Sequence, residues 1–343
     1  MNGEEIRKIQ VTGKSTYIVS LPKRWVTEMK LKAGDGVLIK KQEDSSLLII
    51  PKGLKELEKV EEVEVGFSPE DDPYAMARKI VSLYLIGYNL IRIVAEERIS
   101  AEQRGLLRQF VRKKLMGTEI ISDSPNEMTI QVLLSHPELS VLGALRRMST
   151  VSASMLVDAM TALEKLDLTL AKDVIEVDDE VDRFSMYIIR QLKSAVEDPR
   201  LIREIGLNTA RDCLGCRLIT KSVERIADHA GLIAEKILRL KKPVKKNLLK
   251  KIVAMSASAG SMFENAVQSL FKLDYKLADE IIEKREIIES LENEVIQLIP
   301  KKGFPGDAIN LRLIAESLRR VAEYSTDISE IVLNLTVTTA IKK

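Results

Sequence analysis

The stretch LEKLDLTLAKDVIE, residues 163–176, returns as LFKLDYKLADEIIE at residues 270–283, with eight of fourteen residues identical at an offset of 107. Apolar residues recur at helical spacing on both sides of each copy, so we predict amphipathic helices before and after it. A set of residues in the preceding helix also matches at this offset: Met148, Ser149, Ser154 and Met155 align with Met255, Ser256, Ser261 and Met262. A repeat of this length indicates two copies of one helical unit.

Each copy contains three such helical segments, and prolines separate them. Breaks are expected near Asp198-Pro199 and Pro243 in the first copy, and between Pro300 and Pro305 in the second. Three amphipathic helices joined by short connections form a bundle. We therefore predict a mainly α protein with two tandem three-helix bundles, over residues 137–242 and 243–343.

Composition agrees with a water-soluble helical protein. The 343 residues are 45% hydrophobic, 30% charged and 4% aromatic, which suits helices packed through aliphatic side chains. The most apolar window, residues 82–95, is short and contains Asn89 and Arg92, so no membrane insertion is expected. The N-terminal residues are unlike a signal peptide, and two cysteines suit a reducing compartment. The sequence predicts a cytoplasmic location.

Two acidic pairs lie on the predicted second and third helices of the first bundle. Residues four apart lie about 40° apart around a helix, so each pair points one way. In antiparallel helices four carboxyl groups can converge, and they repel one another unless a cation or protons neutralise them. The alternative is a solvated acidic face with salt bridges to Arg183 and Arg225. The pairs are Asp178 with Asp182, and Glu224 with Asp228.

This layout resembles the PhoU phosphate-uptake regulator family over residues 138–338. The acidic pairs and the segment ERIADHAGLIAE, residues 224–235, carry the resemblance. It implies protein partners, namely a phosphate transporter ATPase or a sensor kinase. It also implies a divalent or ferric metal ion, iron first, with four ligands: Asp178, Asp182, Glu224 and Asp228.

The second copy replaces half of this acidic set by arginine. Guanidinium groups neutralise carboxylates through bidentate hydrogen bonds without any ion. We therefore expect a salt-bridge cluster in the second copy and at most one metal site per protomer, in the first repeat. The aligned pairs are Asp178 with Arg285, Asp182 with Glu289, Glu224 with Arg319 and Asp228 with Glu323.

The two cysteines and the two histidines receive structural interpretations. Cys213 and Cys216 lie inside a long predicted helix, whereas a redox Cys-x-x-Cys pair normally begins one, so we interpret them as small core residues. His229 is five positions from Glu224 and off the shared face, which makes it an outer neighbour of the acidic site. His136 is interpreted as a domain-boundary residue before Pro137.

The N-terminal stretch VTGKSTYIV, residues 11–19, contains part of a phosphate-binding loop. The full loop needs a glycine where Lys8 stands, and a helix rather than the strand-forming run that follows Ser15, so no nucleotide site is predicted. Four short strands and one short helix give too small a core for a lone chain, so we expect a dimer. The strands are expected near residues 7–12, 15–21, 36–41 and 47–50, and the helix at 23–29.

Residues 7–41, RKIQVTGKSTYIVSLPKRWVTEMKLKAGDGVLIKK, resemble the swapped-hairpin DNA-binding domain of the AbrB, SpoVT and MazE regulators. The resemblance implies that residues 1–53 of two chains interleave into one small β-barrel that binds double-stranded DNA. Residues 1–53 carry a net charge of +4, against −2 for the rest of the chain. The alternative is that the basic residues of this segment are solvated strand ends. Several relatives use this fold mainly to dimerise. The expected DNA-contacting residues are Arg7, Lys8, Lys14, Lys23 and Arg24.

Residues 54–136 are predicted to form a small α+β linker domain. A strand is expected within residues 54–67, followed by a helix that opens at Asp71-Asp72-Pro73 and runs to about Glu97. Ser100 is expected to cap a second helix that runs to Lys114, and a hairpin should turn at residues 124–126. No motif in this domain indicates chemistry.

Three functions compete on this evidence. The first is a dimeric DNA-binding regulator of phosphate uptake, with the helical bundles as a metal-binding sensor. The second is a dimeric adaptor that binds no DNA and acts by contacting a transporter ATPase or a sensor kinase. The third is a carboxylate-bridged metal oxidase, but such enzymes need Glu-x-x-His on two helices, and neither histidine is so placed. We predict that the protein is not an enzyme.

Overall fold

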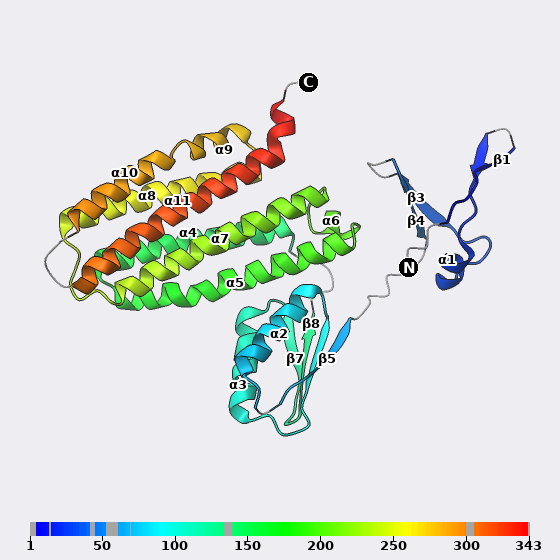
Figure 1. The fold of residues 1–343 in the computed structure, drawn as a ribbon, viewed down its shortest axis with the longest axis horizontal. Coiled ribbons are helices and arrows are strands. Elements are labelled where there is room, and N and C mark those ends of the chain that lie inside the picture. The colour runs from blue at the N-terminus through cyan, green and yellow to red at the C-terminus, as the bar shows by residue number, and fades with distance from the viewer. Residues whose placement is uncertain are drawn as a thin grey trace. The chain divides into compact units, whose positions relative to one another are not determined.

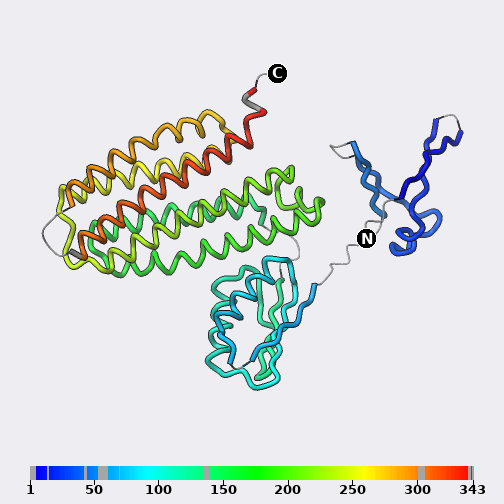
Figure 2. The backbone as a smooth tube through the Cα atoms, in the orientation of Figure 1, coloured from blue at the N-terminus to red at the C-terminus, as the bar shows by residue number. Residues whose placement is uncertain are grey.

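The computed structural model describes residues 5–13, 15–41, 45–52, 61–68, 70–133, 139–299 and 305–341. Lys14 and His136, considered above, lie outside these ranges. The chain divides into two compact units, Met1–Lys59 and Val60–Lys343, which are taken in turn (Figures 1 and 2). The predicted mainly α fold with a small N-terminal β module is confirmed.

The N-terminal unit consists of two hairpins and a short helix. Gly13 has a φ of +66° at the turn of the first hairpin, a conformation that glycine adopts without strain. Gly13 therefore lies at the end of β1, and the strand-forming run after Ser15 is strand β2, as predicted. The elements are β1 (Gln10–Thr12), β2 (Thr16–Ile18), α1 (Lys23–Glu28), β3 (Val37–Lys41) and β4 (Leu47–Pro51), with β1 antiparallel to β2 and β3 antiparallel to β4.

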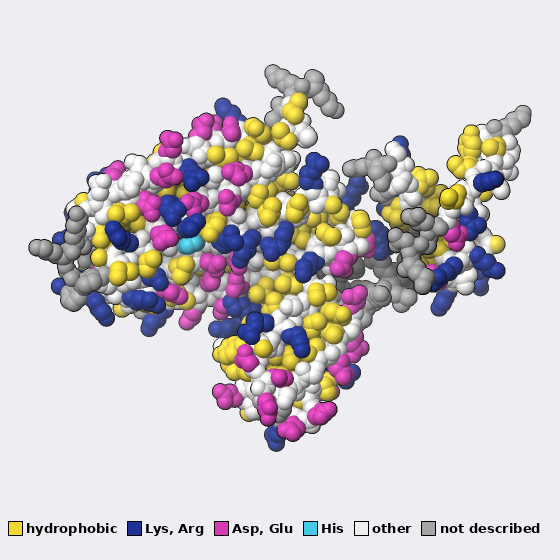
Figure 3. All heavy atoms as spheres, viewed as in Figure 1, with side chains coloured by type: hydrophobic (Ala, Val, Ile, Leu, Met, Phe, Trp, Pro, Cys, Tyr) yellow, Lys and Arg dark blue, Asp and Glu magenta, His cyan; other side chains and the backbone are white. Residues whose placement is uncertain are grey.

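The described residues of this unit form almost no core of their own. Among its described residues Pro51 alone is buried. Hydrophobic side chains instead lie at the surface of both hairpins, as Figure 3 shows in yellow. Two-stranded hairpins without a covered apolar face are marginally stable in water. The most exposed of these side chains are Ile6, Ile9, Val11, Tyr17, Ile39 and Leu47.

The second unit begins with an α+β domain. Its sheet has the order β5-β6-β8-β7, with β5 parallel to β6 and the other neighbours antiparallel. Alternate residues of β6 differ in burial: Ile91 and Ile93 are buried while Arg92 is half-buried, so one face of the sheet carries the core. The elements are β5 (Glu62–Gly66), α2 (Pro73–Ile86), β6 (Leu90–Val94), α3 (Ala101–Lys114), β7 (Thr118–Asp123) and β8 (Glu127–Val132).

One prediction for this domain is wrong. The helix expected to reach Glu97 ends at Ile86, because Gly87 adopts a φ of +124° and the chain then enters strand β6. The apolar window at residues 82–95 thus contains the end of helix α2 and the whole of strand β6. Hydrophobicity alone does not distinguish a helix from a strand in so short a run. The cap at Ser100 is confirmed, with a capping box to Gln103, and so is the hairpin turn.

The rest of the chain forms long helices packed side by side (Figure 1). The repeated stretch spans the turn between the first two helices of each copy. The second helix of the second copy is divided between Ile282 and Arg285, so that this copy has a broken middle helix where one long helix was predicted. The elements are α4 (Val141–Lys165), α5 (Leu168–Glu197), α6 (Leu201–Glu204), α7 (Ala210–Ile237), α8 (Lys246–Lys272), α9 (Tyr275–Ile282), α10 (Arg285–Leu298) and α11 (Pro305–Ala340).

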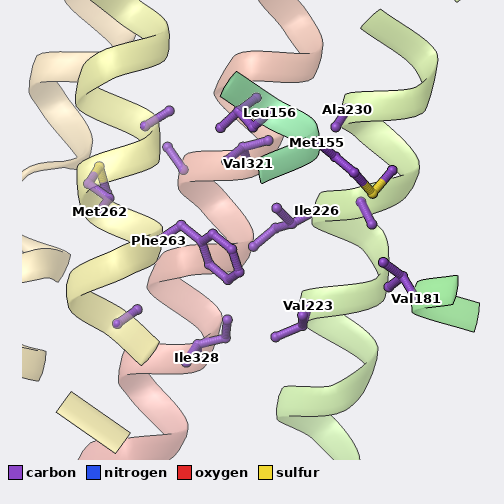
Figure 4. Packing of buried hydrophobic residues seen from close by; sticks show 14 of the residues in the cluster. Met155, Leu156, Val181, Val223, Ile226, Ala230, Met262, Phe263, Val321 and Ile328 are labelled. Carbon is purple, nitrogen blue, oxygen red and sulfur yellow. The ribbon is translucent and has the colours of Figure 1, made fainter. Parts of the chain in front are cut away.

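One continuous apolar core joins the two copies. In Figure 4, Ile226 of α7 lies beside Phe263 of α8 and the side chains of α11. Cys213 and Cys216 are both buried on α7, in agreement with the interpretation as core residues. Burial raises the pKa of the Cys216 thiol to about 12, which keeps it protonated. No helix within the described ranges has the length and apolar character needed to cross a bilayer.

Candidate functional sites

The structure brings the four predicted acidic residues into one electrostatic neighbourhood on α5 and α7. Burial, together with the nearby Asp182 and Asp228 carboxylates, raises the pKa of Asp178 to about 7. Burial likewise raises the pKa of Asp228 to about 6, with Glu224 as the next contribution. Mutual repulsion of this kind needs carboxyl groups on both helices to lie close together. The carboxyl groups of Asp178, Asp182 and Asp228 therefore influence one another, while a site made by all four carboxylates stays a prediction.

Two lysines partly neutralise this acidic site. The Lys114 ammonium lies 2.5 Å from an oxygen of Asp182 and 2.6 Å from an oxygen of Asp179. Burial lowers the pKa of Lys114, but its hydrogen bonds to the two aspartates raise it more, so that the net shift is upward. Lys221 forms an ion pair with Glu224 on its own helix. Among the described residues these lysines, and not Arg183 and Arg225 of the alternative interpretation, are the ion-pair partners of the acidic set.

The four carboxylates have the right chemistry to bind a hard cation, but they are not arranged to do so. Carboxylate oxygens are the ligands that such ions prefer. Within the described ranges, however, no group of three or more His, Cys, Asp or Glu side chains is placed so that it could hold a metal ion. The two lysines offer a physical reason, because each holds one carboxylate toward an ammonium group. The residues as arranged do not fit a metal.

The second repeat contains the expected ion pairs in a different pattern. Arg285 pairs with Glu289 at 3.2 Å on α10, and Arg319 pairs with Glu323 on α11. The link between these two helices comes from Glu292, whose oxygen lies 3.1 Å from Arg319 Nε. Sequence alignment of the repeats could not find Glu292, because its counterpart at an offset of 107 is a serine. The predicted single cluster is thus two pairs, one of which is extended by Glu292.

His229 of α7 packs against the second repeat. Its ring centroid is 5.8 Å from that of Tyr324 on α11. Its Nδ1 is buried with no hydrogen-bond partner among the described residues. Burial lowers the pKa of His229, and the charge of Arg320 lowers it further. These contacts keep the imidazole neutral at pH 7 and place it in the packing of α7 against α11.

In the N-terminal unit, three of the predicted DNA-contacting residues lie together. Arg7, Lys23 and Arg24 line one shallow depression, which also contains Glu5, Thr27 and Glu28. Arg7 pairs with Glu5, and Arg24 Nε lies 2.8 Å from Glu28 Oε1. Such exposed pairs are weak and screened by salt. Lys8 is exposed outside the depression.

Two contacts were not predicted from the sequence, and both attach the α+β domain to the helices. One is Lys114, whose signal was the basic run at the end of α3 opposite the acidic run of α5. The other is Arg190 of α5, a buried arginine with no sequence signal of its own. Its guanidinium donates to the carbonyl oxygens of Tyr84, Gly87 and Tyr88 and to Asn89 Oδ1.

The fold is that of tandem helical bundles, with an acidic site in one of them and a basic β module before them. The PhoU domain model matches residues 145–237 and 252–332, about half of the chain. The chain belongs to the PhoU family. Residues 10–57 match a second model, described as antidote-toxin recognition MazE, bacterial antitoxin. Both resemblances seen in the sequence are therefore confirmed.

Relatives and solved structures agree with this assignment. PhoU homolog 1 of Thermotoga maritima, a phosphate-specific transport system accessory protein, is 26% identical over 203 residues, which cover 57% of this chain and 86% of the relative. The Aquifex aeolicus homologue is 30% identical over 142 residues, or 40% of this chain and 60% of the relative. The fold is similar to that of PhoU from Pseudomonas aeruginosa, with a TM-score of 0.52 and 18% identity over 58% of this chain and 96% of the other.

Proposed function

We propose that the protein is a cytoplasmic, dimeric, DNA-binding regulator of phosphate uptake. In this proposal the N-terminal unit dimerises and binds double-stranded DNA, while the PhoU helices sense the phosphate supply and contact other proteins. The observation that carries the proposal is the N-terminal unit itself, which combines an uncovered apolar surface with a cluster of basic side chains. That unit precedes a PhoU region whose relatives include transport accessory proteins.

The uncovered apolar surface supports dimerisation. Tyr17 is 73% exposed on β2 and Ile39 is 56% exposed on β3, each among further exposed aliphatic side chains. Contiguous exposed apolar surface of this kind is typical of an interaction site. A second copy is the partner that best suits it, because interleaved hairpins would supply the core that one chain lacks.

The basic cluster supports DNA binding. Arg7, Lys23 and Arg24 line one depression, and cationic side chains grouped on one surface can contact several phosphate groups of a duplex. Charge asymmetry along the chain agrees, since the segment of residues 1–53 is positive while the rest is negative. Counterion release from such contacts provides affinity for any duplex DNA.

The test of this proposal compares the full chain with a truncated chain that begins at residue 54. The unit Val60–Lys343 has its own core, so the truncated chain should fold. We expect the full chain to sediment as a dimer and to retard DNA from upstream of its phosphate-uptake genes. The truncated chain should be monomeric, or a weaker dimer, and should retard none. An equally tight truncated dimer would contradict the dimerisation part.

The second candidate is a dimeric PhoU-type adaptor that binds no DNA and contacts a phosphate transporter ATPase or a sensor kinase. Local pairing of Arg7 with Glu5 and of Arg24 with Glu28 favours it, because paired charges attract phosphate groups less strongly. Failure of the full chain to retard any genomic fragment, together with capture of the ATPase or kinase, would select this candidate.

Metal binding in the first repeat is a separate part of the proposal. The ligands would be Asp178, Asp182, Glu224 and Asp228, with one divalent or ferric ion per protomer. Their mutual repulsion supports the idea, because a cation would relieve it. The present arrangement of their side chains does not support it, because two of the four carboxylates are paired with lysines.

A further inference from the structure

A groove lies between α4 and α8, the first helices of the two repeats. Its volume is about 560 Å³, and small-molecule sites in proteins occupy about 300 to 1,000 Å³. Ala153 of α4, with Phe263 and Val267 of α8, gives it an apolar lining. None of its residues belongs to the acidic set of α5 and α7 or to the N-terminal unit. The groove is therefore a separate candidate site for a small molecule.

Arg146 of α4 is positioned in this groove by an aromatic ring. Its guanidinium carbon lies 3.8 Å from the centroid of the Phe271 ring on α8. A cation–π contact attracts a guanidinium to the face of a ring but does not neutralise its charge. Because Arg146 is also exposed, the groove presents a positioned cation whose N–H donors match a carboxylate or a phosphate group.

The other charged residues of the groove do not compensate this cation. Lys272 adds a second cation to the lining, and Glu264 is the one acidic residue there. Within the part of the chain that the structure describes, Arg146, Lys272 and Glu264 form no ion pair. Two cations against one carboxylate leave an excess of positive charge. An anionic ligand therefore has no salt bridge among these side chains to break.

The hydroxyl groups of the groove offer no donors to a ligand. Ser149 Oγ donates to the carbonyl oxygen of Leu145 at 2.8 Å, and Thr150 Oγ1 donates to that of Arg146 at 3.0 Å. A hydroxyl group has one hydrogen, so both are already used. The charged groups of Arg146 and Lys272 are therefore the principal donors left to a ligand.

The pair formed by Arg146 and Phe271 departs from the internal repeat. At the offset of 107, Arg146 aligns with Val253 and Phe271 aligns with Glu164. These corresponding positions lie on the same two helices, yet they have neither the cation nor the ring. Packing that the two copies share therefore does not account for the pair.

We propose that the groove between α4 and α8 binds a small amphipathic acid, which is a molecule with one carboxylate or phosphate group on an apolar body. The acidic group contacts Arg146 and Lys272, and the apolar body lies against Ala153 and Val267. Each helix supplies a cation and apolar surface, so both are needed for the complete site. The inference depends neither on DNA binding by the N-terminal unit nor on a metal ion.

The test measures the affinity of the full-length protein for three molecules by calorimetry. The first, 2-naphthyl phosphate, has both the acidic group and the apolar body. Inorganic phosphate lacks the apolar body and 2-naphthol lacks the acidic group, so each should bind at least about tenfold more weakly. Inorganic phosphate or 2-naphthol that binds as tightly as 2-naphthyl phosphate would overturn the proposal.

Three variants locate the binding of 2-naphthyl phosphate. Arg146→Met should weaken it about tenfold or more, because the principal donor is lost. Arg147→Met is the matched control, since Arg147 is exposed, carries the same charge and does not line the groove. It should change the affinity little. Ala153→Phe leaves both cations in place but fills the apolar part of the groove, and it too should abolish tight binding.

Thermal unfolding provides a second readout and shows that each variant is folded. A ligand that binds the folded chain raises the Tm. Saturating 2-naphthyl phosphate should raise the Tm of the unchanged and Arg147→Met proteins, and should leave that of the Arg146→Met and Ala153→Phe proteins nearly unchanged. Equal affinity in the Arg146→Met and Arg147→Met proteins, or the absence of saturable binding in the unchanged protein, would contradict the proposed site.

Discussion

Leu166 and Leu273 share one left-handed backbone conformation, with φ of +52° and +53°, although 107 residues separate them in sequence. Each ends the first helix of its repeat. The aspartate that follows, Asp167 or Asp274, then caps the next helix by accepting backbone N–H groups. The tripeptide Lys-Leu-Asp, identical in the two copies, therefore forms the tight turn between the first two helices of each repeat. This role explains why both copies retain it.

Replacement of the left-handed leucine by glycine should have different effects in the two repeats. A leucine in this conformation is strained by about 1 kcal/mol or more, and glycine is not. Leu273 is 61% exposed, so Leu273→Gly should raise the stability by up to about 1 kcal/mol. Leu166 packs against the core, so Leu166→Gly should give no gain, because lost packing offsets the relief of strain. Calorimetric Tm values that rise equally in both variants would be inconsistent with this account.

The acidic site predicts an unusual pH dependence in metal-free buffer. The folded-state pKa values of Asp178 and Asp228, about 7 and about 6, are above their ordinary value of 3.8. The folded chain therefore binds more protons than the unfolded chain across this interval. Their contribution to stability is complete below pH 3.8 and is lost as the pH rises through about 6 and 7.

We accordingly expect the Tm to fall between about pH 5 and pH 8, and Asp178→Asn to reduce that fall. The exposed carboxyl group of Glu164 on α4 provides the control, since Glu164→Gln should leave the slope unchanged. Thermal unfolding followed by circular dichroism at a series of pH values makes the comparison. An Asp178→Asn protein with the same pH slope as the unchanged protein would refute this explanation.

Arg190 should be essential for attachment of the α+β domain. Arg190→Met would leave several carbonyl oxygens near the end of α2 without donors in a buried position, at a cost on the order of 3 kcal/mol. Arg190→Lys should rescue little, because an ammonium cannot reproduce the planar fork. Arg78, whose side chain is 72% exposed, is the matched control, and Arg78→Met should cost below about 0.5 kcal/mol. Urea unfolding gives both values, and equal costs would be the contrary result.

The ion pairs of the second repeat predict where metal does not bind. Protein loaded with iron or manganese should contain at most one ion per protomer by elemental analysis. That ion should disappear in an Asp178→Ala, Glu224→Ala double variant and persist in a Glu289→Ala, Glu323→Ala double variant, because Arg285 and Arg319 already neutralise the second set. Loss of metal from the Glu289→Ala, Glu323→Ala variant alone would place the metal site in the second repeat and contradict this prediction.

Much of the architecture was predictable because it rests on local signals. The repeat, the cap at Ser100 and the positive φ of Gly13 each follow from local sequence. Strand β6 was missed because an apolar run of its length suits a helix as well as a strand, and only its pairing with β5 and β8 decides the matter. The tertiary environment overrode the local pattern there.

The candidate sites were predictable only in part, for a related reason. Spacing on a helix placed Asp178 and Asp182 on one face, and the repeat exposed the arginine replacements. Lys114 and Glu292 join these groups from elements whose positions the sequence does not give. Contacts between domains depend on how the domains pack, and no periodicity within one helix encodes that.

The central claim, that the N-terminal unit binds DNA through its basic cluster, is tested most directly by the salt dependence of binding. Affinity for a fluorescent duplex from upstream of the phosphate-uptake genes should fall steeply with salt, and each lost phosphate contact should reduce the log–log slope by about one. The variant Arg7→Ala, Lys23→Ala, Arg24→Ala should therefore lose a slope of about three. The control Lys32→Ala, Lys40→Ala, Lys41→Ala removes equal charge from exposed positions outside the depression and should lose far less. Equal losses in both variants, or a complex indifferent to salt, would contradict the claim.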